Sequence, residues 1–119
     1  MQVHPLTAVS PVDGRYTGKA APLRPVFSEF GLIRYRVAIE ARWLMALSRE
    51  RGIVELEPVG GEAGKLLESL ASGLSLEQAV EVKTIEGTTN HDVKAVEYFL
   101  KKQLAPVDHD GRLREFVHF

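Results

Sequence analysis

The helical spacing of apolar residues constrains the fold of this chain more than any other feature. Apolar side chains recur every three or four positions after Ser28, at Phe30, Ile33, Val37, Ala41, Leu44 and Leu47. This period predicts a helix over about 29–51, with Ser28 as its N-cap and Gly52 as a left-handed C-cap. No segment shows the clear apolar and polar alternation of a strand, so we predict an all-α fold.

Two shorter helices are predicted in the middle of the chain. The first covers 62–72 and buries three leucines, at positions 66, 67 and 70. The second begins at Ser75, because Ser75 and Gln78 have the spacing of a capping box. We expect this second helix to run to about Glu86 and to be closed by Gly87.

A fourth helix is predicted between Thr89 and Pro106, where Val93, Val96, Leu100 and Leu104 share one face. Thr89 is its expected N-cap with Asp92 at the third helical position, and Pro106 is its expected stop. A last helical segment begins near Leu113. The sequence therefore predicts four to five helices.

The first 26 residues differ from the rest, because they hold four of the six prolines. We predict a long extended N-terminal segment there, without regular helix. Within it, 10–14 reads Ser-Pro-Val-Asp-Gly, which is typical of a tight turn. The turn presents Arg15, whose planar fork suits phosphate or carboxylate, and Tyr16, whose hydroxyl can donate. The alternative is an ordinary surface arginine beside a packing tyrosine.

Composition narrows the classes of function. The 119 residues predict a single domain over 1–119, and 15 basic against 16 acidic residues predict no binding of nucleic acid. The absence of cysteine excludes disulfides and thiolate chemistry, and favours the cytoplasm. No stretch is long and apolar enough for a membrane span, so no membrane partner is expected. His4, His109 and His118 form no ligand pattern, and we predict no metal.

The polar face of the 29–51 helix is rich in arginine. Its arginines are Arg34, Arg36, Arg42, Arg49 and Arg51. A solvated face with intrahelical pairs is favoured over a patch for a polyanion, because the chain as a whole is balanced in charge.

A dense polar cluster, Thr-Thr-Asn-His-Asp-Val-Lys, covers 88–94 before the fourth helix. A helix N-terminus offers unpaired N–H groups, and this cluster adds a hydroxyl, an amide, an imidazole and a carboxylate. Such a set can bind an anion and handle a proton. The alternative is ordinary capping by Thr and Asp, which leaves Asn90 and His91 unexplained.

Three motifs now point to a known family. They are Ser-Pro-Val-Asp-Gly-Arg-Tyr at 10–16, Lys-Thr-Ile-Glu at 83–86 followed by TTNHDVKAVEYFLK at 88–101, and Glu-Phe-Val-His-Phe at 115–119. In order and spacing, the chain from about Leu6 to Phe119 resembles the front end of bacterial adenylosuccinate lyases, which belong to the fumarase/aspartase superfamily. The apolar run at 115–119, with no residue to cap it, also suggests the front piece of a longer protein.

The resemblance implies an activity and an assembly. Members of this family eliminate fumarate from adenylosuccinate, giving AMP, and from SAICAR, giving AICAR, in purine nucleotide biosynthesis. It implies the N-terminal helical domain of the superfamily, with no cofactor, and with the central bundle and C-terminal domain absent. The catalytic base serine and acid histidine would lie downstream, and the full-length parent would be a homotetramer whose active sites draw on three subunits.

The resemblance also implies residue roles. Arg15 and Tyr16 would meet the phosphate and ribose, and Asn90, His91 and Asp92 would line the pocket around the base and succinyl group. His91 would orient the substrate or balance its charge. The secondary candidates are Thr89, Lys94 and His118. The competing interpretation is a stand-alone helical module that binds an anion or a partner.

Overall fold

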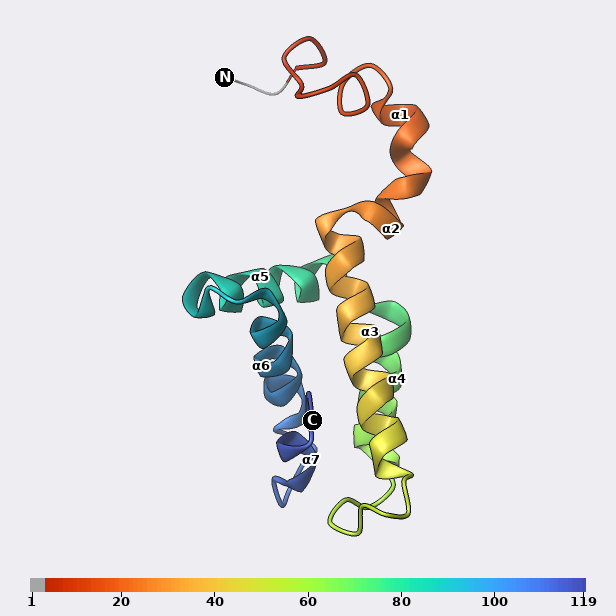
Figure 1. Ribbon diagram of the computed structural model, residues 1–119, viewed down its shortest axis with the longest axis vertical. Coiled ribbons are helices and arrows are strands. Elements are labelled where there is room, and N and C mark those ends of the chain that lie inside the picture. The colour runs from red at the N-terminus through yellow and green to blue at the C-terminus, as the bar shows by residue number, and fades with distance from the viewer. Residues whose placement is uncertain (1–3) are drawn as a thin grey trace. The chain divides into compact units, whose positions relative to one another are not determined.

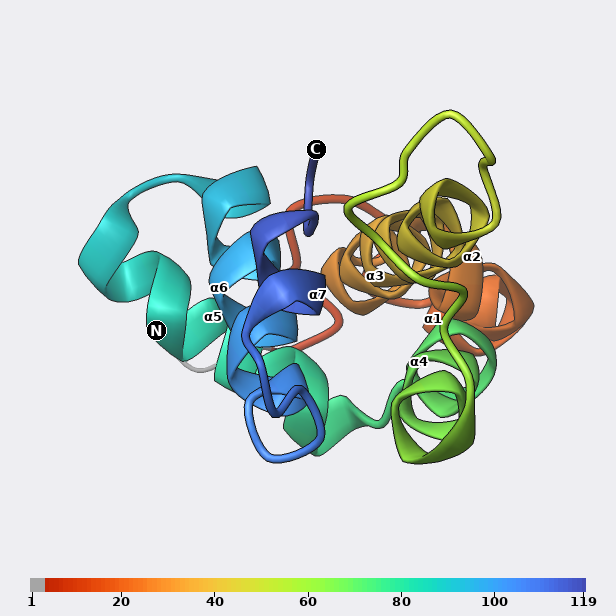
Figure 2. The ribbon, with the colours of Figure 1, turned by 90° about the horizontal axis from the view of Figure 1, so that it is seen from below.

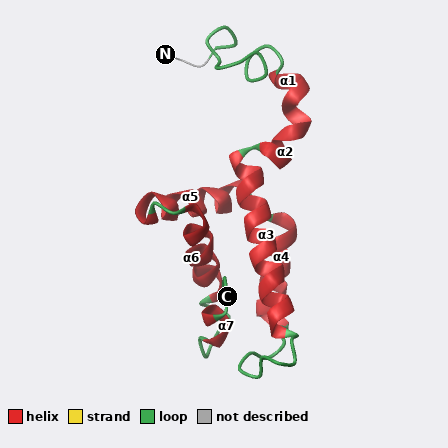
Figure 3. Cartoon of the chain, viewed as in Figure 1, coloured by secondary structure: helices red, strands yellow, loops and turns green. Residues whose placement is uncertain are grey.

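The chain is built from helices joined by turns. The computed structural model describes residues 4–119, and in that range it contains no strand (Figures 1 and 3). The all-α prediction is confirmed. Within the same range, no helix combines the length and apolar character that a membrane crossing requires. Contacts divide the chain into two compact units, one ending at Leu32 and the other running from Ile33 to Phe119. The single domain expected over 1–119 stays a prediction.

The first unit is more helical than the sequence predicted. Its elements are α1 (Thr17–Ala20), the 3-10 helix η1 (Ala21–Leu23) and α2 (Arg24–Phe27). The prediction that no regular helix crosses the first 26 residues was therefore wrong for 17–26. Pro22 and Pro25 each lie within the first two positions of a helix, where the missing N–H is not needed.

The turn at 10–14 is confirmed. The carbonyl oxygen of Ser10 accepts hydrogen bonds from Asp13 N–H (3.1 Å) and Gly14 N–H (3.0 Å). Gly14 is buried, and a Cβ added there would lie 2.5 Å from the carbonyl oxygen of Pro5. Close packing of the backbone, and not a left-handed φ, therefore requires glycine at this position.

The second unit contains most of the helical structure. Helix α3 (Glu29–Ser48) begins in the first unit and continues into the second, and it is followed by α4 (Gly61–Gly73), α5 (Leu76–Thr89), α6 (Asp92–Leu104) and α7 (Arg112–Glu115). Ser28 Oγ accepts from Gly31 N–H (3.0 Å) at the start of α3, and Ser75 and Gln78 form the predicted capping box of α5. Figure 2 shows the same helices from below.

The core consists of the apolar faces that the helical spacing predicts. From α3 it takes Ile33, Val37, Ala41, Leu44 and Leu47; from α4, Leu67 and Leu70; from α5, Ala79 and Val82; and from α6, Val96, Phe99, Leu100 and Leu104. Three residues that were predicted on these buried faces, Phe30, Leu66 and Val93, are only half-buried. Helices α5 and α6 pack against each other, and the chain changes direction between them at a short polar junction (Figure 1).

The end of α3 differs from the prediction. The helix stops at Ser48, and Gly52 is not among the described residues with a left-handed φ. Ser48 is buried, donates its hydroxyl to the Met45 carbonyl (2.7 Å) and accepts from Val59 N–H (3.1 Å). This side chain ties the end of α3 to the connection before α4, so no glycine cap is needed.

The end of α5 also differs. The helix continues through Gly87 to Thr89, and Asn90 takes the left-handed conformation, with φ at 54°. Asn90 N–H donates to the Glu86 carbonyl (2.7 Å). Asparagine tolerates this conformation better than most residues, so Asn90 and not Gly87 closes the helix.

Two valines on α5 test this description of the core. Val82 is 1% exposed, whereas Val80 is 57% exposed. Val82→Ala should lower the free energy of unfolding by roughly 1–3 kcal/mol, because it removes buried methyl groups and leaves a cavity. Val80→Ala is the matched control and should change it by less than about 0.5 kcal/mol. Urea unfolding measures both, and equal losses would show that the α5 face is assigned wrongly.

Candidate functional site

The junction between α5 and α6 carries most of the predicted site residues, and we define it as residues 89–94. Asn90 is the C-cap of α5, and His91 is the N-cap of α6. His91 Nδ1 accepts from Lys94 N–H (3.0 Å), and His91 N–H donates to Thr89 Oγ1 (3.2 Å). The prediction that Thr89 caps this helix with Asp92 at its third position was wrong. The left-handed turn at Asn90 places His91 at the cap, and Asp92 becomes the first helical residue.

The hydrogen bond at the N-cap of α6 determines which nitrogen of the His91 ring is free to donate to a ligand. Because Nδ1 accepts from the Lys94 backbone, the neutral imidazole carries its proton on Nε2. His91 is exposed. It therefore offers an Nε2–H donor to an anionic or carbonyl oxygen of a ligand, and can do so while it still caps the helix.

Asp92 is held through both of its carboxylate oxygens. Oδ1 accepts from Val93 N–H (2.8 Å), and Oδ2 lies 2.9 Å from Arg36 Nη2 on α3. The Val93 hydrogen bond and the Arg36 guanidinium together lower the pKa of Asp92, outweighing the opposing effect of desolvation. Asp92 is therefore a carboxylate at neutral pH. Sequence analysis placed Arg36 only on a generally basic face, because no local spacing links it to Asp92.

Lys94 projects from the first turn of α6 and is held along that helix. Its Nζ lies 3.0 Å from Glu97 Oε2 and 5.4 Å from the centre of the Tyr98 ring. The hydrogen bond to Glu97 raises the pKa of Lys94, so the amine is cationic.

Glu97 is a member of this site that sequence reasoning missed. It is buried, and Lys101 Nζ lies 3.7 Å from the same Oε2. Burial raises the pKa of Glu97, but the hydrogen bond from Lys94 and the charges of Lys101, Lys94 and His118 outweigh burial and lower it. The spacing of three and four residues to the two lysines was the signal that could have identified it.

An open concavity of about 330 Å³ lies beside the junction. It is lined by Lys83, Glu86, Gly87 and Asn90. Lys83 Nζ lies 2.9 Å from Glu86 Oε2. Because Gly87 carries no side chain, nothing at that position fills the hollow next to Asn90.

Arg15 and Tyr16 lie in the first unit, directly after the turn at 10–14. The Arg15 guanidinium carbon is 4.7 Å from the centre of the Tyr16 ring, and Lys19 Nζ is 5.7 Å from it. Tyr16 is 40% exposed. The structure thus gathers two cations around one tyrosine, a combination suited to a phosphate.

His118 contacts helix α3 and not the junction. Its Nδ1 lies 2.6 Å from Glu40 Oε1, and its φ is 60°. Trp43 Nε1 on the same helix donates to the carbonyl oxygen of Phe119 (3.2 Å). These contacts hold the segment 118–119 against α3. Sequence analysis missed Glu40, because the two partners lie far apart in the chain.

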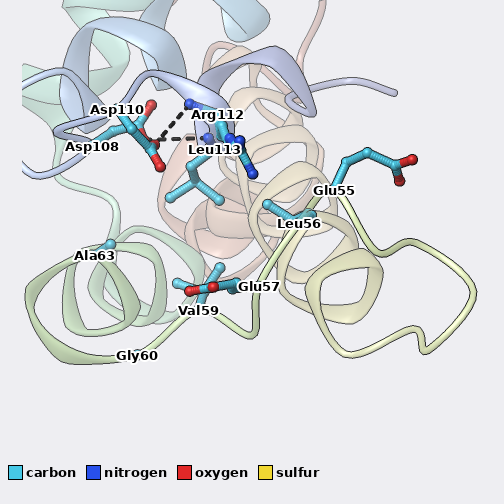
Figure 4. Close-up of a pocket in the computed structure, with 10 residues that line it drawn as sticks. All are labelled: Glu55, Leu56, Glu57, Val59, Gly60, Ala63, Asp108, Asp110, Arg112 and Leu113. Atoms are coloured by element: carbon cyan, nitrogen blue, oxygen red, sulfur yellow. Dashed lines mark hydrogen bonds between the residues drawn. The ribbon is translucent and has the colours of Figure 1, made fainter.

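A second concavity, of about 200 Å³, lies between the connection before α4 and the start of α7 (Figure 4). Its lining includes four acidic side chains, Glu55, Glu57, Asp108 and Asp110, and a single arginine, Arg112. The excess of negative charge in this lining would repel an anionic ligand. None of the predicted site residues lines it, and we interpret it as part of the structural framework.

Asp108, which lines this concavity, accepts hydrogen bonds from the first turn of α7. Its Oδ1 accepts from Leu113 N–H (3.3 Å), and its Oδ2 accepts from Arg114 N–H (3.0 Å) and Nε (2.9 Å). Burial raises the pKa of Asp108, but these donors and the Arg114 charge outweigh burial and lower it. The buried carboxylate therefore fixes the first turn of α7.

The sign of the pKa shift of Asp108 predicts a pH dependence. A lowered folded-state pKa means that its contribution is present above the unfolded value of 3.8 and is lost as pH falls through the folded pKa. Asp108→Asn should lower the free energy of unfolding at neutral pH by about 1–3 kcal/mol and flatten its decline below about pH 4.

Asp110→Asn is the control for this prediction, because Asp110 is exposed and Oδ1 accepts only from Arg112 N–H (3.0 Å) among its described contacts. Chemical unfolding across pH measures both variants. An Asp108→Asn protein that keeps the acid sensitivity of the parent would contradict this assignment.

The all-helical fold is consistent with the helical N-terminal domain of the fumarase/aspartase superfamily. In comparisons with known proteins, no family model matches the chain. Curated adenylosuccinate lyases do match it over all 119 residues: 48% identical in Vibrio cholerae, 48% in Escherichia coli K12 and 47% in Haemophilus influenzae. The chain spans 26% of the length of each of these relatives. The predicted resemblance to adenylosuccinate lyases is confirmed.

Proposed function

We propose that this chain is one part of an adenylosuccinate lyase. The whole enzyme would eliminate fumarate from adenylosuccinate, giving AMP, and from SAICAR, giving AICAR, in purine nucleotide biosynthesis. The observation that carries the proposal is the 47–48% identity to adenylosuccinate lyases over the entire chain.

The catalytic groups and the substrate-binding groups would come from different parts of the enzyme. A base removes the proton from the carbon next to a carboxylate, the carbon–nitrogen bond breaks, and an acid protonates the departing nitrogen. Donors stabilise the negative charge that develops on the carboxylate. We assign the base and the acid to the part of the enzyme beyond this chain, and binding and orientation of the substrate to residues within it.

The junction residues supply complementary groups. His91 would donate from Nε2 to a substrate oxygen, and Asn90 would use its amide as donor and acceptor toward the base. Asp92 would accept from an N–H or hydroxyl group of the substrate through its remaining lone pairs. Thr89 and Lys94 are secondary candidates in the same segment.

Arg15 and Tyr16 would bind the phosphate and ribose of the nucleotide. The two cations that flank Tyr16 support this role, because guanidinium and ammonium groups both favour phosphate. His118 is a secondary candidate, since its imidazole is already placed by Glu40.

The proposal includes the assembly and the setting of the enzyme. The full-length enzyme would be a homotetramer in the cytoplasm, using a nucleotide substrate and no metal or cofactor. The competing proposal is a stand-alone helical module that binds an anion. The open reading frame separates the two, because continuation into a threonine-serine segment after Phe119 supports the lyase and a stop codon supports the module.

Two substitutions at His91 test the site. His91→Ala should lower kcat/KM of the full-length enzyme for adenylosuccinate at least about 100-fold, because a positioned donor is lost. It should also lower stability by about 1 kcal/mol, because the cap of α6 is lost. His91→Asn keeps an N-cap but removes the imidazole, so it should lose activity with little loss of stability.

Steady-state fumarate release and thermal unfolding separate the two effects. If His91→Asn retained the activity of the parent, His91 would be a cap alone, and its place in the substrate site would be refuted.

Residues 1–119 purified alone should release no fumarate from adenylosuccinate, because the proposed base and acid lie outside them. Absorbance of the nucleotide and of fumarate follows the reaction, with the full-length enzyme as the positive control. Turnover by the isolated chain that scales with its concentration would contradict the assignment of the base and acid to residues outside it.

A further inference from the structure

Arg36 reaches the junction from another helix. Its Nη2 lies 2.9 Å from Asp92 Oδ2, and its side chain is 28% exposed. The other polar contacts described for residues 89–94 join positions no more than four apart in the sequence. The ion pair is therefore the polar contact that ties this junction to α3 in the described chain.

The contact fixes the orientation of the Asp92 carboxylate. One oxygen is held by Val93 N–H and the other by Arg36, so the carboxylate cannot rotate without losing one of them. The Asp92 side chain nevertheless remains 49% exposed, and a carboxylate has about four acceptor positions. Asp92 thus has both fixed geometry and acceptor capacity left for a ligand.

The same contact bears on His91. Asp92 is the first residue of α6 and follows His91 directly, so anchoring Asp92 to α3 also anchors the first turn of α6. The His91 ring accepts from Lys94 N–H in that turn. A shift of the turn would move the imidazole with it.

We infer that Arg36 is a positioning residue for the substrate site: it holds Asp92, and through it the first turn of α6, in the orientation that binds substrate. This inference rests on the proposed function. Arg36 does not itself touch the substrate. Because a partly exposed ion pair contributes little to folding, we expect this one to act mainly through geometry.

The test uses the full-length enzyme. Arg36→Met should raise KM for adenylosuccinate roughly three- to tenfold with a smaller change in kcat, because substrate binding loses its fixed partner. Arg36→Lys keeps the charge but not the planar fork, and should recover part of the loss. Lys102→Met is the matched control, since it removes another interhelical pair, Lys102 Nζ to Glu81 Oε2 at 3.9 Å, away from the junction. It should leave KM unchanged.

A double-mutant cycle identifies the path of the effect. In an Asp92→Asn background, Arg36→Met should raise KM no further, because its target is already lost. Multiplying effects, or a normal KM in Arg36→Met itself, would overturn the inference while the proposed function stands. A wild-type enzyme that releases no fumarate from adenylosuccinate would overturn the proposed function, and the inference with it.

Discussion

The left-handed turn at Asn90 is the constraint on which the site depends. It ends α5 and places His91 at the cap of α6, with Asp92 as the first helical residue. A residue at position 90 that could not adopt a φ of 54° would shift both helix ends and displace the His91 imidazole and the Asp92 carboxylate. The polar groups proposed to orient substrate are therefore positioned by the same backbone feature that lets α5 and α6 pack together.

The charged side chains around the turn at Asn90 are held in ion pairs and hydrogen bonds. Arg36 and the Val93 N–H keep Asp92 ionised, whereas Lys94 and Lys101 share the buried carboxylate of Glu97. These five ionic side chains are thereby paired before a ligand arrives. Because these polar groups are already oriented, few of their contacts need to change when a ligand binds.

Helical spacing predicted the buried faces of α3 and α6, because a period of 3.6 follows directly from packing one side of a helix. The proline and glycine signals were misleading at 17–26, where prolines occupy positions in the first turns, and at the ends of α3 and α5, where Ser48 and Asn90 replace the expected glycine caps. Polar character at 88–94 predicted the candidate site. The pairs Arg36–Asp92 and Glu40–His118 could not be predicted, because each joins segments that meet only after folding.

The most direct test of the central claim is a crystal structure of the full-length protein with bound adenylosuccinate, using a variant that lacks turnover but keeps this chain unchanged. The account predicts that His91 Nε2 lies within hydrogen-bonding distance of the substrate, with Asn90 and Asp92 in the same pocket. Substrate bound elsewhere, with the residues at 89–94 facing solvent or another part of the protein, would contradict it.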